Sequence, residues 1–164
     1  MQQNCLSLAG IAIALLLGGC DRQQQPRDGI GMVERVVDGD TVDIRIDGTE
    51  ERVRLIGIDT PETQKLDSPA ECYGSEASTY TEALLPVGTR VRLERDTVGR
   101  DHYGRLLGYI HRLDDDLFVN YDILRQGYAQ PLTIDPNTIH AATFATAARL
   151  AEADNLGLWA ACAG

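Results

Sequence analysis

The chain has 164 residues and a formal net charge of −10, and 43% of its residues are hydrophobic. This length suits one domain, and the apolar content excludes a chain that stays disordered. The acidic total excludes a protein that attracts nucleic acid through its overall charge, because long-range attraction to a polyanion needs positive potential. Of the 15 Lys and Arg residues, all except Lys65 are Arg. Local placement of Arg can still favour phosphate, since a guanidinium grips two of its oxygens at once.

The first residues have the pattern of an export signal. Residues 1–19 carry no charged side chain, and residues 11–17 form an apolar run that is too short to span a membrane. The sequence Leu-Gly-Gly-Cys that ends at Cys20 is similar to a bacterial lipobox, whose cysteine receives lipid. We therefore expect a signal peptide over residues 1–19, and a lipidated Cys20 with a flexible tether over residues 20–31. Such a protein would face the periplasm or the exterior; simple secretion without lipid is the alternative.

Two cysteines remain once the leader is removed and Cys20 is lipidated. Cys72 and Cys162 form an even pair in what would be an oxidising compartment, which favours one disulfide. Such a bond would contribute on the order of 4 kcal/mol in the chain-entropy model. Two free thiols are the alternative, because the sequence does not show that the sulfur atoms meet.

Residues 32–164 are expected to form one domain that is rich in strands in its first half. Residues 42–47 alternate cleanly between apolar and polar side chains, which is typical of a strand with one buried face. Strands are predicted over residues 32–37, 42–47, 52–58, 90–94 and 105–112.

Helical periodicity appears between and after these strands. Helices are predicted over residues 75–85, from Asn120 as N-cap to Gly127 as stop, and over residues 138–155. The order predicts an α+β fold that is mainly β, a five-stranded Greek-key barrel of the OB type with about three helices.

Three motifs carry chemistry. The first is Asp-Gly-Asp-Thr at residues 38–41, which alone is a common turn. The second is Arg-Leu-Ile-Gly-Ile-Asp-Thr-Pro-Glu at residues 54–62, followed by Tyr-Gly-x-Glu-Ala at residues 73–77. The third is Asp-His-Tyr-Gly-Arg at residues 101–105. In this order they resemble the staphylococcal nuclease (thermonuclease) family, and the likeness extends from about Met32 to Trp159.

The resemblance implies a calcium-dependent nuclease that hydrolyses phosphodiester bonds of DNA, with RNA as a further candidate substrate. We also expect the protein to be a monomer. It matches three residues to the calcium ligands, namely Asp40, Asp59 and Thr60. It matches three to catalysis, with Glu62 as general base or water-orienter and Arg54 and Arg105 on the phosphate, and it adds Tyr103 as a phosphate contact. The chemistry fits, since calcium prefers carboxylate and carbonyl oxygens and phosphoryl transfer needs positive donors.

Each residue also has a structural interpretation. Asp40 and Asp59 could cap turns, Glu62 could be a solvated loop acid, and Arg54 and Arg105 could pair with Glu51 and Asp101. Two alternatives exist for the whole chain. One is a non-catalytic barrel that binds nucleic acid or protein. The other is a lipoprotein with a structural or scavenging role in the envelope, in which calcium only stabilises the fold.

Two segments depart from the family's pattern. The family's two nucleotide-contacting tyrosines cannot be placed in residues 128–136, and the loop after Glu62 is acidic. Both departures predict weaker nucleotide binding.

Overall fold

A closed barrel of five strands forms the body of the molecule. The computed structural model describes residues 29–63 and 69–162. The barrel order is β1-β2-β3-β6-β5, and β5 pairs back with β1. All pairings are antiparallel except β3 with β6, and a separate two-stranded sheet joins β4 to β7. The strands are β1 (Gly29–Asp38), β2 (Thr41–Ile46), β3 (Thr49–Leu55), β4 (Gly57–Asp59), β5 (Arg90–Glu94), β6 (Leu106–Arg112) and β7 (Gln130–Leu132).

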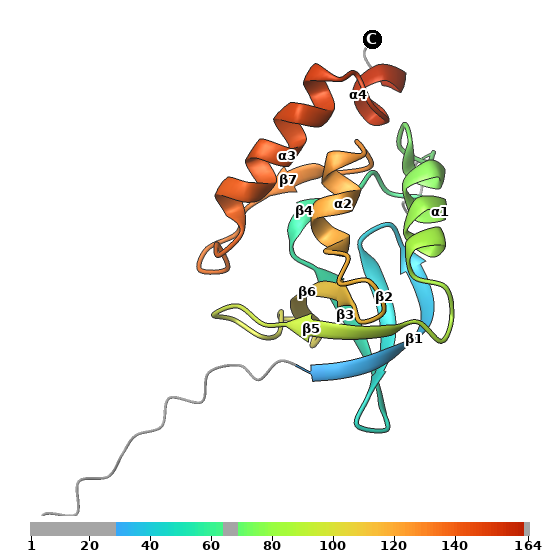
Figure 1. Ribbon diagram of the computed structural model, residues 1–164, viewed down its shortest axis with the longest axis vertical. Coiled ribbons are helices and arrows are strands. Elements are labelled where there is room, and N and C mark those ends of the chain that lie inside the picture. Colours follow the sequence, from blue (N-terminus) through green and yellow to red (C-terminus); the bar gives the residue numbers. More distant parts are fainter. Residues whose placement is uncertain (1–28, 64–68, 163–164) are drawn as a thin grey trace, which may run out of the picture.

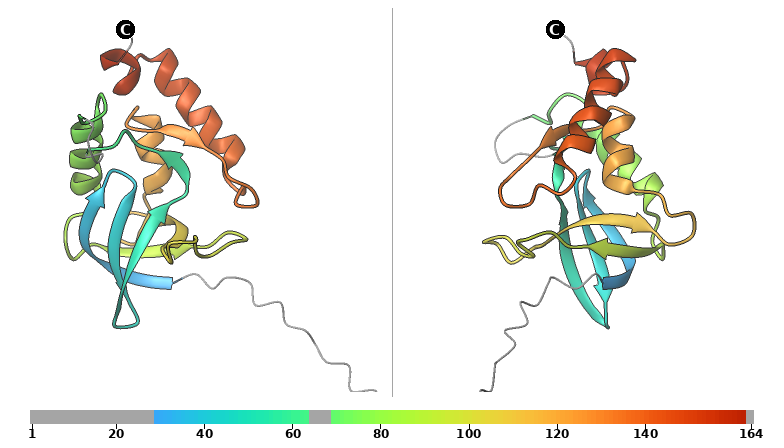
Figure 2. Two further views of the ribbon diagram at one scale, coloured as in Figure 1. Left: turned by 180° about the vertical axis from the view of Figure 1, so that it is seen from behind. Right: turned by 60° about the vertical axis from the view of Figure 1, so that its left-hand side comes forward.

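The predicted mainly β barrel is confirmed, and the described residues contain one short helix more than the three predicted. The helices are α1 (Gly74–Leu84), α2 (Val119–Arg125), α3 (Ala141–Ala153) and α4 (Leu158–Ala161). They gather over one end of the barrel, whereas the turn between β2 and β3 lies at the other end (Figures 1 and 2). In the described part of the chain, no helix combines the length and the apolar character needed to cross a membrane.

The core follows from the two periodicities in the sequence. In the strands, alternate residues such as Val53 and Leu55 are fully buried. In α3, the buried residues recur at helical spacing, from Phe144 through Ala147 and Ala148 to Ala151. These side chains pack the helices against the end of the barrel that the helices cover.

The third predicted strand is interrupted, which changes the direction of the chain beside the site. The prediction ran one strand through residues 52–58, but β3 ends at Leu55 and β4 begins at Gly57. Gly57 has φ +80°, and an added Cβ there would meet the ring of Phe144, so the bend needs glycine. Because of this bend, β4 leaves the barrel and pairs with β7.

Asn120 has a different role from the predicted N-cap. It lies inside α2 and is fully buried. Its side-chain oxygen accepts from the backbone N–H of Ile110 at 2.9 Å, and its amide donates to the carbonyl of Ile56 at 2.9 Å. Asn120 therefore fastens α2 to β6 and to the bend after β3. The predicted stop is present, since α2 ends at Arg125 and Gly127 has φ +78°.

A carboxylate on β5 holds the start of α3. Glu94 accepts hydrogen bonds from His111 on β6 at 2.9 Å and from His140, directly before α3, at 3.0 Å. Arg92 also lies 3.9 Å from it. Burial alone would raise the pKa of Glu94, but the hydrogen bonds from the two histidines outweigh it and lower the pKa.

We expect Glu94→Gln to lower the free energy of unfolding at pH 7 by about 1–3 kcal/mol. A carboxyl whose pKa is lower in the folded state stabilises the fold above its unfolded pKa of about 4.3, and this contribution disappears as the pH falls through the folded value. Urea denaturation should therefore show wild type and Glu94→Gln converging below pH 4. Glu34→Gln, which alters the exposed pair with Arg45, should cost less than about 0.5 kcal/mol. Equal losses in the two variants at pH 7 would contradict this role.

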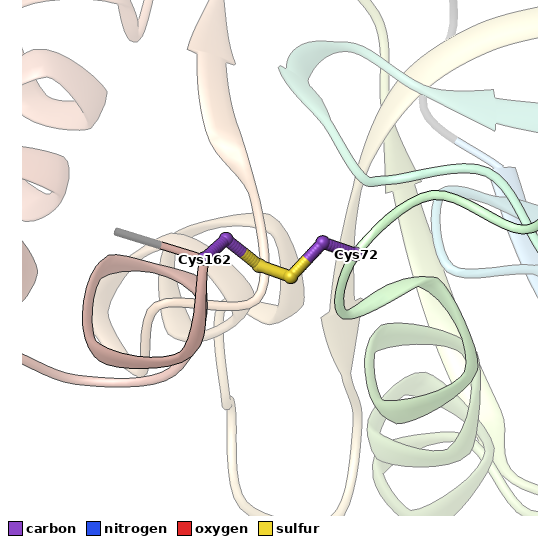
Figure 3. Close-up of a disulfide and its surroundings, with 2 residues drawn as sticks. All are labelled: Cys72 and Cys162. Carbon is purple, nitrogen blue, oxygen red and sulfur yellow. A yellow bond between two sulfur atoms is a disulfide. The ribbon is translucent and has the colours of Figure 1, made fainter. Parts of the chain in front are cut away.

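A disulfide joins the two ends of the helical layer. Cys72, just before α1, is bonded to Cys162, just after α4, with a Cα–Cα distance of 6.0 Å and a sequence separation of 90 residues (Figure 3). Both cysteines are exposed.

Candidate active site

Parallel pairing of β3 and β6 places two guanidinium groups on one face of the barrel. Val53 lies opposite Leu106 in the register, and both are buried. Successive side chains in a strand point to opposite faces, so the neighbouring Arg54 and Arg105 point away from the barrel interior. The two Arg side chains line the same pocket of about 370 Å³. The structure thus brings together two residues that are far apart in the sequence.

Arg54 joins the two predicted calcium-ligand carboxylates. Its Nη1 lies 2.9 Å from Oδ2 of Asp40, and its Nη2 lies 2.9 Å from Oδ1 of Asp59. Asp40 comes from the turn between β1 and β2, and Asp59 ends β4. The same Nη1 donates to the carbonyls of Leu55 and Ile58 at 2.7 and 3.1 Å. Arg54 therefore holds the bend after β3 closed, and the bend turns Asp59 toward Asp40.

The two carboxylates have different surroundings. Asp40 is buried, whereas the side chain of Asp59 is 56% exposed. Burial raises the pKa of Asp40, although Arg54 and the backbone N–H of Thr60 oppose that shift. One acid is thus fixed against the barrel, and the other is open to solvent beside it.

Thr60 packs against the turn that carries Asp40. Its backbone N–H donates to Oδ2 of Asp40 at 3.2 Å, and its side chain is buried. A Cβ added at Gly39 would lie 2.7 Å from the Thr60 hydroxyl, so the close approach of the two segments needs glycine. The three predicted metal ligands are therefore neighbours in the fold.

Glu62 is half-buried among other acids. Burial, a hydrogen bond with Asp38, and the charges of Asp38, Asp40 and Glu71 together raise the pKa of Glu62 to about 7. Its backbone N–H donates to the carboxylate of Glu71 at 3.0 Å. The charge of Asp40 therefore acts on Glu62. Glu62 lies on the side of the site where α1 begins.

Arg105 is held by the loop that precedes β6. Its Nε donates to Oδ2 of Asp101 at 2.7 Å, and its guanidinium carbon lies 5.6 Å from the ring centre of Tyr103. Tyr103 is 75% exposed and packs against His102, with 3.7 Å between ring centres. The structural pairing of Arg105 with Asp101 is therefore present, and it fixes the guanidinium in the wall of the pocket.

Arg54 does pair with neighbouring carboxylates, but these are Asp40 and Asp59 and not the expected Glu51. Glu51 instead binds Arg100, through two contacts of 2.6 and 2.9 Å. Arg100 comes from the loop between β5 and β6, so this pair ties that loop to β3. Arg54 is left to Asp40 and Asp59.

The pocket beside the two guanidinium groups has an aliphatic wall. Leu132 contributes to it from the end of β7, and Ile134 and Pro136 contribute from the segment between β7 and α3. This segment and the loop between β5 and β6 project from the same side of the molecule (Figures 1 and 2). Tyr128 lies elsewhere, stacked on Tyr80 with 3.9 Å between ring centres.

The donors around Arg54 suit a hard cation. Asp40 and Asp59 supply carboxylate oxygens that converge on one guanidinium, and carboxylate and carbonyl oxygens are what calcium prefers. Within residues 29–63 and 69–162, no group of three or more His, Cys, Asp and Glu side chains suits a metal ion. A site here would consist of two carboxylates with the backbone carbonyl of Thr60, completed by water, and that composition fits calcium better than zinc.

Sequence reasoning missed two residues next to Glu62. The sequence predicts only a turn at Asp38, yet this residue hydrogen-bonds Glu62 and accepts from the Thr63 hydroxyl at 3.3 Å. Glu71 lies at the end of the polar loop after Glu62 and has no motif of its own. The repeated acid in the Asp-Gly-Asp motif was the only signal for the first, and nothing in the sequence pointed to the second.

Comparison with known proteins decides the family. A family model described as staphylococcal nuclease homologue matches residues 52–161. The chain belongs to the staphylococcal nuclease family. A thermonuclease from Staphylococcus intermedius is 42% identical over 128 residues, which are 78% of this chain and 74% of that protein.

Two further proteins are similar to the chain over less of their own length. A thermonuclease from Staphylococcus hyicus is 42% identical over 105 residues, 64% of this chain and 60% of that protein. Endonuclease YncB from Bacillus subtilis (strain 168) is 35% identical over 129 residues, 77% of this chain and 60% of that protein. The chain therefore spans about three fifths of these two relatives.

Several predicted features lie outside the described residues. They are the signal peptide, the lipidation site Cys20, the tether up to residue 28 and the middle of the acidic loop after Glu62. The last residues assigned to the tether, 29–31, already belong to β1.

Proposed function

We propose that this protein is a nuclease that hydrolyses phosphodiester bonds of DNA and of RNA with calcium as its cofactor. Its nuclease class follows from its family, whose similar members are named thermonucleases and endonucleases. The observation that carries the proposal is the position of Arg54, which contacts Asp40 and Asp59 and lines one pocket with Arg105.

Asp40, Asp59 and the carbonyl of Thr60 are the residues that would hold calcium. The bound ion would supply positive charge to the phosphate oxygens and bring water to the site. Arg54 gives up part of its contact with the carboxylates and turns its remaining N–H groups to the phosphate. Arg105, fixed by Asp101, supplies the second guanidinium fork.

Glu62 orients the attacking water and takes its proton. The water oxygen forms a bond to phosphorus, the ester bond opposite it breaks, and the departing oxygen receives a proton from solvent. Tyr103 sits at the exposed edge of Arg105, where its hydroxyl can reach a phosphate oxygen of the same strand. Every residue that this reaction needs is present in the chain, which disfavours a barrel that only binds.

Withdrawal of calcium tests this function. Excess EGTA should abolish cleavage of single-stranded DNA by the purified domain, and added calcium should restore it in full. Magnesium added in place of calcium is the control, because magnesium demands a stricter octahedral geometry than this donor set offers. Cleavage that continues undiminished in EGTA would rule out the calcium-dependent mechanism.

We also propose that the protein acts outside the cytoplasm as a monomer on a lipid anchor. Residues 1–19 would be removed, Cys20 would carry lipid, and the following residues would link it to β1. The disulfide between Cys72 and Cys162 supports an oxidising compartment. Mass spectrometry of the mature N-terminus should find Cys20 lipidated, and an unmodified Cys20 would contradict the anchor.

A further inference from the structure

Glu71 is the hydrogen-bond partner of both the backbone N–H and the backbone carbonyl of Glu62. The N–H of Glu62 donates to Oε2 of Glu71 at 3.0 Å, and the N–H of Glu71 donates to the carbonyl of Glu62 at 3.0 Å. The segment that carries Glu71 lies on the far side of the loop, nine residues further along the chain. Glu62, which follows β4, is therefore positioned by a residue that lies at the entry of α1.

The start of α1 is pressed against the same backbone. The N–H of Gly74 donates to the carbonyl of Glu71 at 3.1 Å. A Cβ added at Gly74 would lie 2.5 Å from the carbonyl oxygen of Glu62, so no side chain fits between the helix and the Glu62 backbone. Small movements of residues 71–74 must therefore shift Glu62.

The disulfide fixes this segment to the body of the protein. Cys72 lies between Glu71 and Gly74 and is bonded to Cys162 after α4 (Figure 3). The N–H of Leu158, the first residue of α4, donates to the carbonyl of Gly127 at 2.8 Å, and Gly157 closely approaches Gly127. Hydrogen bonds and one disulfide thus connect Glu62, through Glu71 and α4, to the turn that follows α2.

We propose that Glu71 and the Cys72–Cys162 disulfide are positioning elements for Glu62, so that reducing the disulfide lowers the turnover of the nuclease while its barrel stays folded. This inference rests on the proposed role of Glu62. Both cysteines are exposed and so accessible to thiol–disulfide exchange. In that exchange a dithiol gives two electrons and two protons to the bond, leaving thiols on Cys72 and Cys162 while its own sulfur atoms form a disulfide. Nuclease activity would then depend on the oxidising compartment.

The test compares calcium-dependent cleavage by the oxidised protein, by the protein treated with dithiothreitol, and by Cys72→Ser/Cys162→Ser. Circular dichroism in parallel confirms that each is folded at the assay temperature. We expect kcat to fall about 10-fold or more without the disulfide, because a misplacement of about 1 Å costs as much as 100-fold. KM should stay unchanged, since Arg54 and Arg105 are not linked to the disulfide. Dithiothreitol should have no effect on the double variant.

Glu71 variants test positioning with the disulfide intact. Glu71→Ala should lower kcat by a similar factor. Glu71→Gln should retain most of the wild-type kcat, because the amide oxygen of the glutamine can still accept from the N–H of Glu62. Glu82→Ala, on the exposed side of α1, should match wild type. These variants also decide the question if the double serine variant does not fold. In a Glu62→Gln background, reduction should cause no further loss. Unchanged kcat after reduction and in Glu71→Ala, with Glu62→Gln inactive, would overturn this inference alone. An active Glu62→Gln would overturn the proposed catalytic role of Glu62, on which the inference rests.

Discussion

Glu62→Gln is expected to lower kcat for calcium-dependent cleavage of single-stranded DNA by about 100- to 10,000-fold, the range that a general base contributes. Glutamine has nearly the same shape and can still fit among Asp38, Asp40 and Glu71, but it cannot take a proton from water. KM and calcium affinity should change little, because Glu62 is neither a proposed ligand nor a phosphate contact. Steady-state kinetics on one oligonucleotide, at saturating calcium, measures both parameters.

The matched control for Glu62→Gln is Glu82→Gln, which makes the same chemical change on an exposed position of α1. It should retain wild-type kcat. A Glu62→Gln protein that is folded and cleaves within about threefold of wild type would remove Glu62 from the reaction, since even a modest general base contributes more than that.

Arg105→Ala should be the second most damaging change. Removing one preorganised donor from developing negative charge costs about 100- to 1,000-fold, and Arg105 is the guanidinium that Asp101 fixes in the pocket wall. Arg105→Lys keeps the positive charge but loses the planar fork, so it should fall between alanine and wild type. The measurement is kcat/KM for single-stranded DNA at constant ionic strength.

Arg149→Ala provides the comparison for the Arg105 variants. Arg149 is exposed on α3, where its guanidinium donates to the Thr146 hydroxyl. Arg149→Ala therefore removes the same charge without changing the site. If Arg105→Ala and Arg149→Ala lower kcat/KM equally, the effect of Arg105 is one of net charge and the assigned role is wrong.

The strands and the site motifs were predictable because their signals are local. Alternation at residues 42–47 gave β2, and the three motifs named the residues that the fold brings together around Arg54. The bend at Gly57 was not predictable, because it depends on Phe144 in a helix that lies far along the chain. Without that bend, β4 and its pairing with β7 could not be foreseen.

Buried polar links were missed for the same reason. Asn120 reads as a helix cap, since asparagine favours that position, but it joins α2 to Ile110 and Ile56. Glu71 reads as one more acid of a polar loop, and its contact with Glu62 is visible only when the disulfide and α1 are in place. Sequence patterns name the groups that do chemistry, whereas the residues that position them follow from tertiary structure.

Calcium binding by the aspartate variants tests the central claim most directly. In a calorimetric titration, the wild-type domain should bind calcium at one site, and Glu62→Gln should bind it equally well. Asp40→Asn and Asp59→Asn should each weaken binding by about 10-fold or more, since affinity follows the number of ligand charges. Calcium that binds all four proteins with the same affinity would contradict a site built from these two aspartates.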